Sequence, residues 1–533
     1  MPLLTDLPPE ILYHILGYVD PHDLAWIPRT CKTLYHAVTA NTSLFKQVYL
    51  RHLDAPSGGP IDWERSLKRL VQLRQLCERS DADDKKDELD FVHQTVVELL
   101  KNASAASADG ARLGSATNIC QSRNADILTD IFSAESNQEA FLCRSFIYER
   151  ARAEFHARDI RYWHGPPKPD HQKSAHLHCL YGVPLLFAYP SARRRTRTNL
   201  MHPFACSKVY DLRQYTEQSK WGPFMSDGTM RVDWEKVEAI LLVLGDNMTN
   251  MTNFNLSVLP VADTFCTVPF AGTWAHSWRN NALGSSLLCE LEVPSSSPSS
   301  SSAPSSSSPE LIDPYGIAGV WLRVVCFMDY TDFFAYNFSL DEQPPPHVPR
   351  PSIDVGQATR LILMRIFVTA IEKPGPEDGQ ALPVVHFKGV SKSLDQTFDE
   401  NADSDLRGTV RLTPEGEVRW TTFSIFGGVE RWRSESVQVG GVRSAKGVLG
   451  HWFDKDFDPR GPAGPTAFWK ISDKDPLSDP QGGGGEGEDE LMATLDVLDG
   501  DYETNDDEDE DEEGEDDSDD DDAWPPRPPI MQT

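Results

Sequence analysis

The chain has 533 residues, a formal net charge of −32, 39% hydrophobic residues and nine cysteines. A chain of this length has material for two or three domains. Of its 82 acidic residues, 23 lie between Glu486 and Asp522, a stretch without Lys or Arg, so the rest of the sequence has an ordinary charge. We therefore expect no nucleic-acid partner and no anionic membrane partner.

The spacing of the cysteines and the length of the apolar segments indicate the cellular compartment of the protein. The cysteines form no C-x-x-C pair and no even spacing, and no stretch approaches about eighteen uncharged apolar residues. The chain also starts without a basic and then apolar leader. We expect a reducing compartment, the cytoplasm or the nucleus.

Residues 4–51 predict a group of short helices. Proline is tolerated in a first helical turn, so Pro8 and Pro9 open the first helix. Asp23 is expected to cap a second helix that Pro28 cuts short, and Ser43 to cap a fourth. The apolar stripe of the first helix consists of Ile11, Leu12, Ile15, Leu16 and Val19. So few residues cannot bury a self-sufficient core, which indicates a protein partner for this stripe.

The same residues resemble the F-box. The matching positions are Leu7-Pro8, Glu10-Ile11-Leu12, Ile15-Leu16, Asp23-Leu24, Cys31-Lys32, Leu34 and Leu44-Phe45. Pro28 and Phe45 depart from the family pattern, which usually has a helix-compatible residue and a Trp there. In that family the motif docks on the Skp adaptor of a cullin ubiquitin ligase. The resemblance implies an adaptor-binding face made of Leu7, Pro8, Ile11, Leu12, Ile15, Leu16, Leu24 and Leu34; the alternative is an ordinary helical hairpin on a larger core.

The rest of the chain divides by pattern. Helical spacing continues over 62–77, 89–100 and 126–152. We predict an F-box over 1–54, a helical arm over 55–160 and a β-rich, barrel-like domain over 161–475. A Ser/Pro-rich insertion over 294–313 and an acidic tail over 476–533 are expected to be disordered. The fold class is α+β.

Short apolar runs with Gly and Pro turns favour a barrel or sandwich after residue 161. The segment 358–372 is apolar on both faces, which predicts a sheet covered on each side. One helix is expected within this domain, opened by Asp233 and ended by Gly245. The predicted strands are 177–189, 207–215, 287–293, 319–327, 358–372, 384–388, 408–413, 417–426, 431–439 and 466–471.

The second half also resembles the C-terminal β-barrel of F-box only protein 31 and its relatives, through residues 319–323, 408–412, 420–423, 447–453 and 456–466. In that family the barrel captures the substrate. Trp, Tyr and Arg dominate binding hot spots. We therefore predict a substrate site with Trp452 in a loop over 447–464, Lys455 and Asp456 beside it, and then Trp321, Arg323 and Tyr330.

Other motifs are weaker. His171, His176, His178 and Cys179 lack a second well-spaced ligand pair, so we interpret them as a polar loop entering a strand and expect no metal and no cofactor. No G-x-S-x-G motif occurs, and Asp399, Asp403 and Asp405 are typical of a solvated loop. The basic residues 193–197, on a predicted loop, indicate a solvated charge run, a nuclear-import signal or a phosphate-reading patch.

These patterns favour a non-catalytic substrate receptor of a Skp–cullin–F-box ubiquitin ligase, with the Skp adaptor, a cullin reached through it and a protein substrate as partners. Two alternatives stay open. One is an F-box scaffold or chromatin-associated factor that acts outside a ligase. The other is a β-barrel enzyme with a helical regulatory head, which requires a pocket with convergent polar groups.

Overall fold

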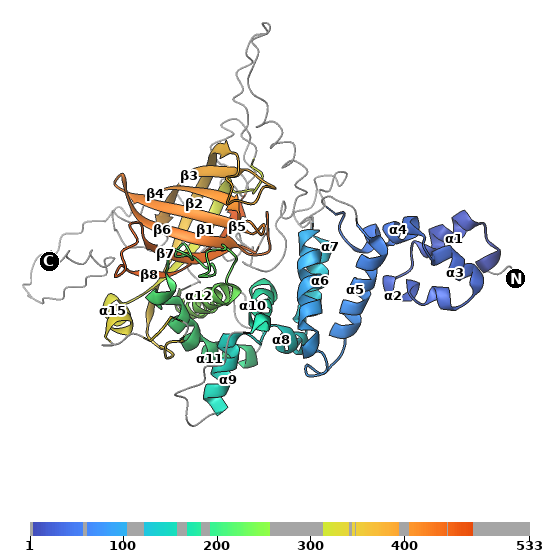
Figure 1. Cartoon of the computed structure of the whole chain (residues 1–533), viewed down its shortest axis with the longest axis horizontal. Coiled ribbons are helices and arrows are strands. Elements are labelled where there is room, and N and C mark those ends of the chain that lie inside the picture. Colours follow the sequence, from blue (N-terminus) through green and yellow to red (C-terminus); the bar gives the residue numbers. More distant parts are fainter. Residues whose placement is uncertain are drawn as a thin grey trace, which may run out of the picture.

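The computed structural model describes residues 4–56, 61–103, 122–156, 168–182, 192–255, 313–339, 344–346, 348–393, 404–444 and 446–472. A small helical head stands at one end and a β-barrel at the other, with helices between them (Figure 1). The predicted strand 287–293, the acidic tail and, except for Asp313, the Ser/Pro-rich insertion lie outside the described residues.

Residues 4–54, which we call the head, fold as short helices, as predicted. They are α1 (Pro9–Leu16), α2 (Pro21–Leu24), α3 (Lys32–Val38) and α4 (Thr42–His52), with 3-10 turns at Leu4–Asp6 and Ile27–Arg29. Two predicted caps are wrong. Asp20 rather than Asp23 caps α2, and Asn41 rather than Ser43 caps α4, because the capping oxygen must come from the residue that directly precedes the first turn.

Five helices follow: α5 (Trp63–Cys77), α6 (Leu89–Lys101), α7 (Arg123–Ser133), α8 (Glu135–Phe141) and α9 (Phe146–His156). The helical spacing predicted here is confirmed. The head is joined to them through buried Asp54, whose carboxylate accepts hydrogen bonds from Ser122 Oγ at 2.5 Å and from the Arg123 backbone N–H at 2.9 Å. Arg123 Nη1 also donates to the Leu50 carbonyl at 2.8 Å, at the end of α4. The head is therefore fixed to the arm.

Three further helices follow: α10 (Pro169–Tyr181), α11 (Ala192–Val209) and α12 (Trp234–Asn255). Of these, the sequence predicted only α12. Two predicted strands are wrong in their described residues. The segment 177–189 begins with the end of α10, and the segment 207–215 contains the end of α11 and a 3-10 turn at Leu212–Gln214. Both segments are buried on nearly every side, so they lack a helical period in the sequence. Helices thus continue to residue 255, inside the stretch predicted as β-rich, and the division into domains stays a prediction.

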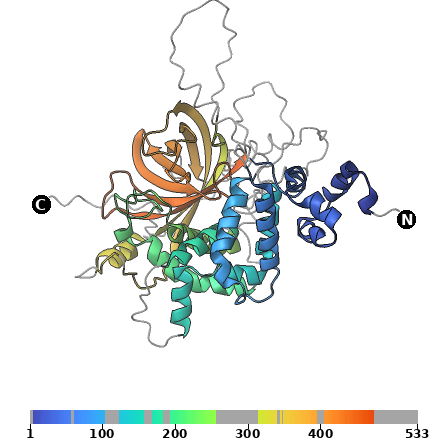
Figure 2. The ribbon, with the colours of Figure 1, turned by 45° about the vertical axis from the view of Figure 1, so that its right-hand side comes forward.

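Helix α12 also runs through Gly245, which was expected to end it. A mid-helix glycine costs only about 1 kcal/mol, and Leu241 and Leu244 are fully buried in the core that α12 shares with β1. Packing therefore outweighs the local preference. The helices gather along one side of the barrel (Figure 2).

Eight antiparallel strands form a closed barrel in sequence order, with β8 pairing back to β1. The strands are β1 (Gly319–Met328), β2 (Gln357–Glu372), β3 (Val384–Ser393), β4 (Ser404–Leu412), β5 (Val418–Phe426), β6 (Val429–Gln438), β7 (Val448–Asp454) and β8 (Ala463–Ser472). Helix α15 (Tyr330–Phe338) lies in the connection between β1 and β2. The predicted helical head followed by a β-barrel is confirmed.

Two strand predictions need correction. Strand β7 was taken for part of a loop over 447–464; all seven of its residues are buried, so the sequence shows no alternation there. Strand β2 is not covered on both sides, because Phe367 is 42% exposed and most residues after it are half-buried or exposed. As in other barrels, one face of β2 points inward while the other meets solvent or a neighbouring element.

Alternation along β1 separates the two faces of the barrel wall. Leu322 and Val324 pack outward in the core shared with the helices, whereas Trp321 points inward. Inside one end of the barrel, Trp321, Trp420 and Phe468 pack edge to face with ring centroids 5.2–5.8 Å apart. Toward the other end, Val325, Trp432 and Trp452 pack together and leave a small cavity beside them.

Candidate functional site

The head carries most of the exposed large apolar side chains. In the described part of the chain fourteen such residues are exposed, and eight of them lie in the head: Leu4, Ile11, Tyr13, Ile15, Tyr18, Trp26, Tyr35 and Leu50. Ile11 and Ile15 are 49% and 38% exposed and lie one turn apart on α1. Exposed apolar residues concentrated in so short a segment mark an interaction surface.

The predicted adaptor-binding residues fall into three groups by burial. Ile11, Ile15 and Pro8 are exposed, and Leu7 and Leu34 are half-buried. Leu12, Leu16 and Leu24 are at most 4% exposed, because they form the core of the head itself. The adaptor-binding face stays a prediction, and the exposed group is what a partner reaches without opening the head.

The exposed aromatic residues Tyr18, Trp26 and Tyr35 were not among the predicted contacts. Arg51 lies over the Tyr18 ring with its guanidinium carbon 3.5 Å from the centroid, and Arg29 lies over Trp26 at 4.4 Å. The sequence does not show these ring–guanidinium contacts; its only signal was the presence of aromatic residues within the segment that resembles the F-box.

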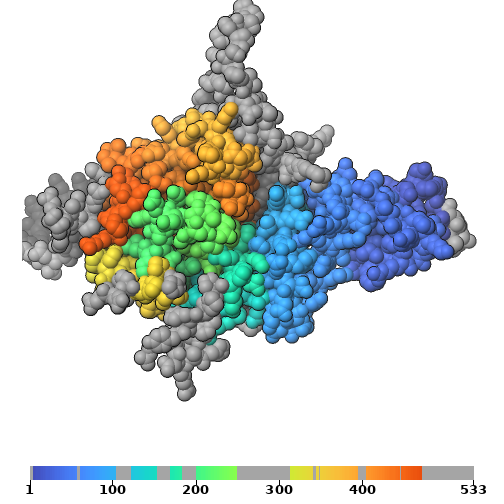
Figure 3. Space-filling model, viewed as in Figure 1, coloured from blue at the N-terminus to red at the C-terminus, as the bar shows by residue number. Residues whose placement is uncertain are grey.

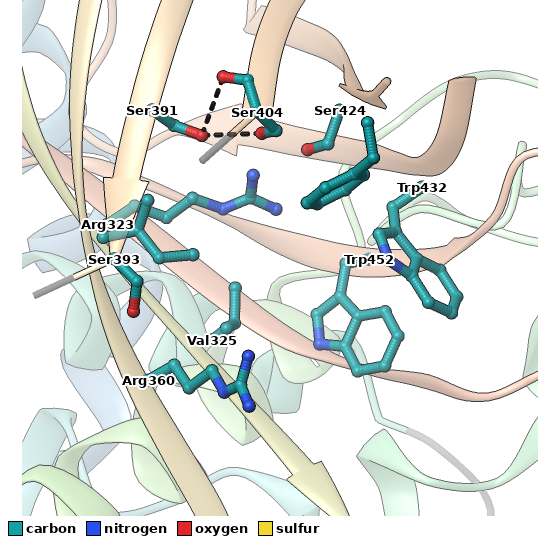
Figure 4. Close-up of a pocket in the computed structure, with 11 residues that line it drawn as sticks. Arg323, Val325, Arg360, Ser391, Ser393, Ser404, Ser424, Trp432 and Trp452 are labelled. Atoms are coloured by element: carbon teal, nitrogen blue, oxygen red, sulfur yellow. Dashed lines mark hydrogen bonds between the residues drawn. The ribbon is translucent and has the colours of Figure 1, made fainter. Parts of the chain in front are cut away.

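The second candidate site is a cavity of about 50 Å³ inside the barrel, toward the end of β1. It draws side chains from seven of the eight strands (Figure 4). Its lining consists of Arg323, Val325, Arg360, Ile362, Ser391, Ser393, Ser404, Ser424, Phe426, Trp432 and Trp452. Among the described residues that line it, the polar groups are two arginines and four serines, which are suited to binding an anion.

Arg323 is the most buried charge in this lining, with 6% exposure. Its Nε donates to Thr466 Oγ1 at 3.0 Å, and this is its one side-chain hydrogen bond within the described residues, where no carboxylate pairs with it. Burial lowers the pKa of the Arg323 guanidinium to about 10, which leaves it protonated at neutral pH. Arg360, from the neighbouring strand β2, adds a second cationic side chain.

Hydroxyl groups and aromatic rings form the opposite walls of the cavity. Ser391 Oγ lies 2.7 Å from Ser404 Oγ and 3.2 Å from the Ser404 carbonyl oxygen. The rings of Trp432 and Trp452 pack edge to face at 5.3 Å, and Trp452 Nε1 donates to the Cys326 carbonyl at 3.0 Å. Figure 4 shows the serines and Arg323 on one side and the two tryptophans on the other.

The six predicted substrate-binding residues separate in space. Arg323 and Trp452 line the cavity together. Trp321 is 3% exposed in the filled end of the barrel, so it is a core residue. Tyr330 begins α15 and donates from its hydroxyl to the Arg460 carbonyl at 3.2 Å, and Lys455 and Asp456 pair with each other at 2.7 Å beyond β7. The last three do not line the cavity.

The histidine-rich segment lies on the buried helix α10, which corrects the prediction of a polar loop. His176 stacks on Trp234 at 3.6 Å, and His178 Nδ1 lies 2.6 Å from Glu238 Oε1, while His171 lies beside Glu149. Their side chains thus meet separate partners. The described residues contain no group of three or more His, Cys, Asp or Glu that could hold a metal.

One buried cluster combines the residue types of a nucleophilic triad. His202 Nε2 lies 3.4 Å from Cys206 Sγ and 3.8 Å from Asp246 Oδ2. The sulfur lies farther from the other ring nitrogen, Nδ1, at 3.9 Å, so thiol and carboxylate are both nearest to Nε2, whereas a triad carboxylate orients the ring through the nitrogen that does not face the nucleophile. Burial also raises the pKa of the Cys206 thiol far above its usual range, so it stays protonated. The cluster therefore lacks the arrangement of a catalytic triad.

The remaining motifs add no site. Asp405 is exposed on β4, and Asp399 and Asp403 lie outside the described residues. The basic residues 193–197 belong to α11 rather than to a loop, and their side chains lie outside the described part. Within the described ranges, no helix has both the length and the apolar character needed to span a bilayer.

Comparison with known proteins identifies one domain. Residues 4–51 match the F-box-like family model. No curated protein and no solved structure shows a significant match to the chain. The chain thus carries an F-box-like domain, and domains of this family bind the Skp adaptor and are typical of non-catalytic adaptor subunits.

Proposed function

We propose that this chain is the substrate-recognition subunit of a Skp–cullin–F-box ubiquitin ligase, acting in the cytoplasm or the nucleus. Its head binds the Skp adaptor, which links it to a cullin, and its barrel binds a protein substrate. The chain itself catalyses nothing; it holds substrate lysines at high effective concentration near the ubiquitin-loaded enzyme. The cavity inside the closed barrel supports the assignment of substrate binding to the barrel.

The concentration of exposed apolar side chains on the F-box-like head is the observation that carries this proposal. Complete burial of one such side chain contributes about 1.5–3 kcal/mol. Ile11 and Ile15 are already half-covered, so they supply only part of the binding energy. Aromatic residues such as Trp26 and Tyr35 are the usual hot spots of interfaces and extend the surface available to a partner.

The arrangement of the two sites suits a receptor. The head and arm extend from the thicker body that contains the barrel (Figure 3). Buried hydrogen bonds at Asp54 fix the head to this arm. An adaptor bound to the head therefore leaves the barrel accessible to a substrate, and the fixed joint limits how far the two sites can move apart.

The test is adaptor binding by the double variant Ile11→Asp/Ile15→Asp. Both side chains are exposed, so the head should stay folded while two charges at the interface weaken adaptor binding at least tenfold. Co-purification of the Skp adaptor with the full chain measures this effect. The matched control is Val429→Asp, which places a charge on the barrel at a residue that is 65% exposed.

Leu12→Asp is a poorer test, because Leu12 is 4% exposed and a charge there would disrupt the head's own core. Full adaptor binding by the double variant would contradict the proposed docking surface. The same pull-down is probed for cullin, since recovery of the adaptor without cullin would favour the scaffold alternative.

A further inference from the structure

The barrel interior holds a cation without an acidic partner among the described residues. Burying an unpaired charge costs several kcal/mol in general. Arg323 nevertheless sits inside the barrel, and within the described part of the chain its side chain has the Thr466 hydroxyl as its single hydrogen-bond partner. A buried group left so incompletely matched calls for an explanation, and a missing anion is the simplest one.

Other buried charges of this chain show what a structural charge looks like. Glu435, on the outer wall, is fully buried and is paired with Arg419 at 2.8 Å and also with Arg433. Asp211 lies 3.1 Å from Arg350 and 2.7 Å from Arg213. At these positions the fold matches one carboxylate with two guanidinium groups. Buried Lys85 has no carboxylate partner either, but its ammonium donates to the Cys77 and Arg79 carbonyls, to Ser136 Oγ and to Asn137 Oδ1. Among the described residues Arg323 has neither a carboxylate nor more than one hydrogen bond, so its charge is less completely matched than these.

The groups around Arg323 can complete an anion site. Its Nε is occupied, but both terminal amino groups remain without hydrogen bonds in the described residues, and their fork fits two oxygens of one anion. The Ser424 hydroxyl, in the same lining, likewise has no hydrogen-bond partner among the described side chains. Ser391 and Ser404 supply two more hydroxyls next to Arg323 (Figure 4).

The size of the cavity limits what can enter it. Its volume is about 50 Å³, on a measure in which one water molecule needs roughly 10–15 Å³. A few waters or one small tetrahedral anion fit, whereas a large aromatic side chain does not. The apolar wall of Trp432 and Trp452 suits the stem that carries such a group.

We propose that this cavity binds the phosphate of a phosphorylated serine or threonine in the protein substrate. The proposal deepens the proposed function, because it rests on the barrel being the substrate-binding part. A phosphate has three acceptor oxygens and a charge of about −1.5 to −2, so it can use the two amino groups of Arg323 and the serine hydroxyls together. A carboxylate has two oxygens and leaves some of these donors unmatched.

The experiment measures fluorescence polarisation of degenerate peptide libraries with the full chain in complex with the Skp adaptor. Three libraries are compared: a central phosphoserine with an amidated C-terminus, a central serine with an amidated C-terminus, and a central serine with a free C-terminal carboxylate. We expect the phosphoserine library to bind at least tenfold more tightly than the other two.

The decisive variant is Arg323→Met, which keeps much of the side-chain length and removes the charge. It should bind the phosphoserine library no better than the serine library, and its melting temperature should be unchanged or higher, because an unpaired buried charge is removed. Lys388→Met is the matched control: it removes a positive charge from an exposed position on β3 and should leave binding unchanged.

Equal binding of all three libraries, a preference for the free carboxylate alone, or unchanged phosphopeptide binding by Arg323→Met would overturn the proposal. A lower melting temperature of Arg323→Met with phosphopeptide binding intact would show that the guanidinium is structural. Adaptor binding is measured on the same samples. A chain that binds phosphopeptide but no adaptor would contradict the ligase assignment while leaving the phosphate site intact.

Discussion

The head and the barrel depart from ordinary burial in opposite ways. The head leaves apolar side chains such as Ile11 and Trp26 outside, whereas the barrel keeps the charge of Arg323 inside. The head is too short to enclose its apolar residues, but eight closed strands enclose space readily. We propose one explanation for both departures, a binding partner: an apolar protein surface at the head and an anion in the barrel.

The largest effect is expected at the filled end of the barrel. Trp420 is 1% exposed and packs against Trp321 and Phe468. Trp420→Ala should therefore lower the free energy of unfolding by about 3–5 kcal/mol. Denaturant unfolding followed by circular dichroism measures the loss. A cost below about 1 kcal/mol would mean that this end is as loosely filled as the cavity end.

Neighbouring residues of α1 give the sharpest contrast within the head. Leu16 is 2% exposed, so Leu16→Ala should destabilise the head by about 2–5 kcal/mol. Ile15 is 38% exposed, so Ile15→Ala should lower the free energy of unfolding by only about 0.5 kcal/mol. Its loss of adaptor-binding free energy should be larger than this loss of stability. Thermal unfolding and adaptor binding are measured for both variants. Equal stability losses would remove the distinction between inner and outer apolar residues.

A smaller effect on the free energy of unfolding is expected when the pH is lowered, through a histidine buried between the helices and the barrel. Burial, and then the charge of Lys236, lower the pKa of His451 to about 3, with Asp233 acting in the opposite sense. The unfolded chain takes up this proton below about pH 6.5, so stability from neutral His451 is complete above that pH and is lost toward pH 3. Between pH 7 and pH 5 the loss is about 2 kcal/mol.

The variant His451→Gln tests this assignment, since it removes the titrating group at a site whose ring lies 4.8 Å from that of Tyr215. Its unfolding free energy should fall less steeply between pH 7 and pH 5 than that of the unaltered chain. The same slope in both proteins would assign the acid sensitivity to other groups.

The smallest effect belongs to an exposed ion pair on the outer barrel wall. Arg407 pairs with Glu430, and their side chains are 44% and 30% exposed. Because solvent screens such pairs, Arg407→Ala should change the free energy of unfolding by about 0–1 kcal/mol and leave peptide binding intact. Chemical denaturation checks this. A cost clearly above about 1 kcal/mol would contradict the view that solvent screens this pair.

Sequence patterns predicted the amphipathic parts of this chain and failed where segments are buried on every side. The stripe on α1, the spacing of Leu67 and Leu70 on α5 and the strands that became β4 and β5 were all predicted. In α10 and β7 nearly every side chain is covered, so hydrophobic periodicity disappears and the two kinds of element look alike.

The cavity was only partly predictable for a different reason. Arg323 and Trp452 were among the predicted binding residues because of their residue types. Trp321 lies two positions from Arg323 on the same inward face, yet it belongs to the filled end. Ser391, Ser404 and their partners converge only through strand register, which no local pattern in the sequence encodes.

A bridging assay tests most directly whether one chain joins an adaptor to a phosphorylated substrate. The Skp adaptor is immobilised, and the fluorescent phosphoserine library is added with the full chain. We expect peptide on the surface only when the chain is present. Ile11→Asp/Ile15→Asp should remove both chain and peptide, and Arg323→Met should retain the chain and lose the peptide. Retention of peptide by Arg323→Met, or of the chain by the double variant, would contradict the account.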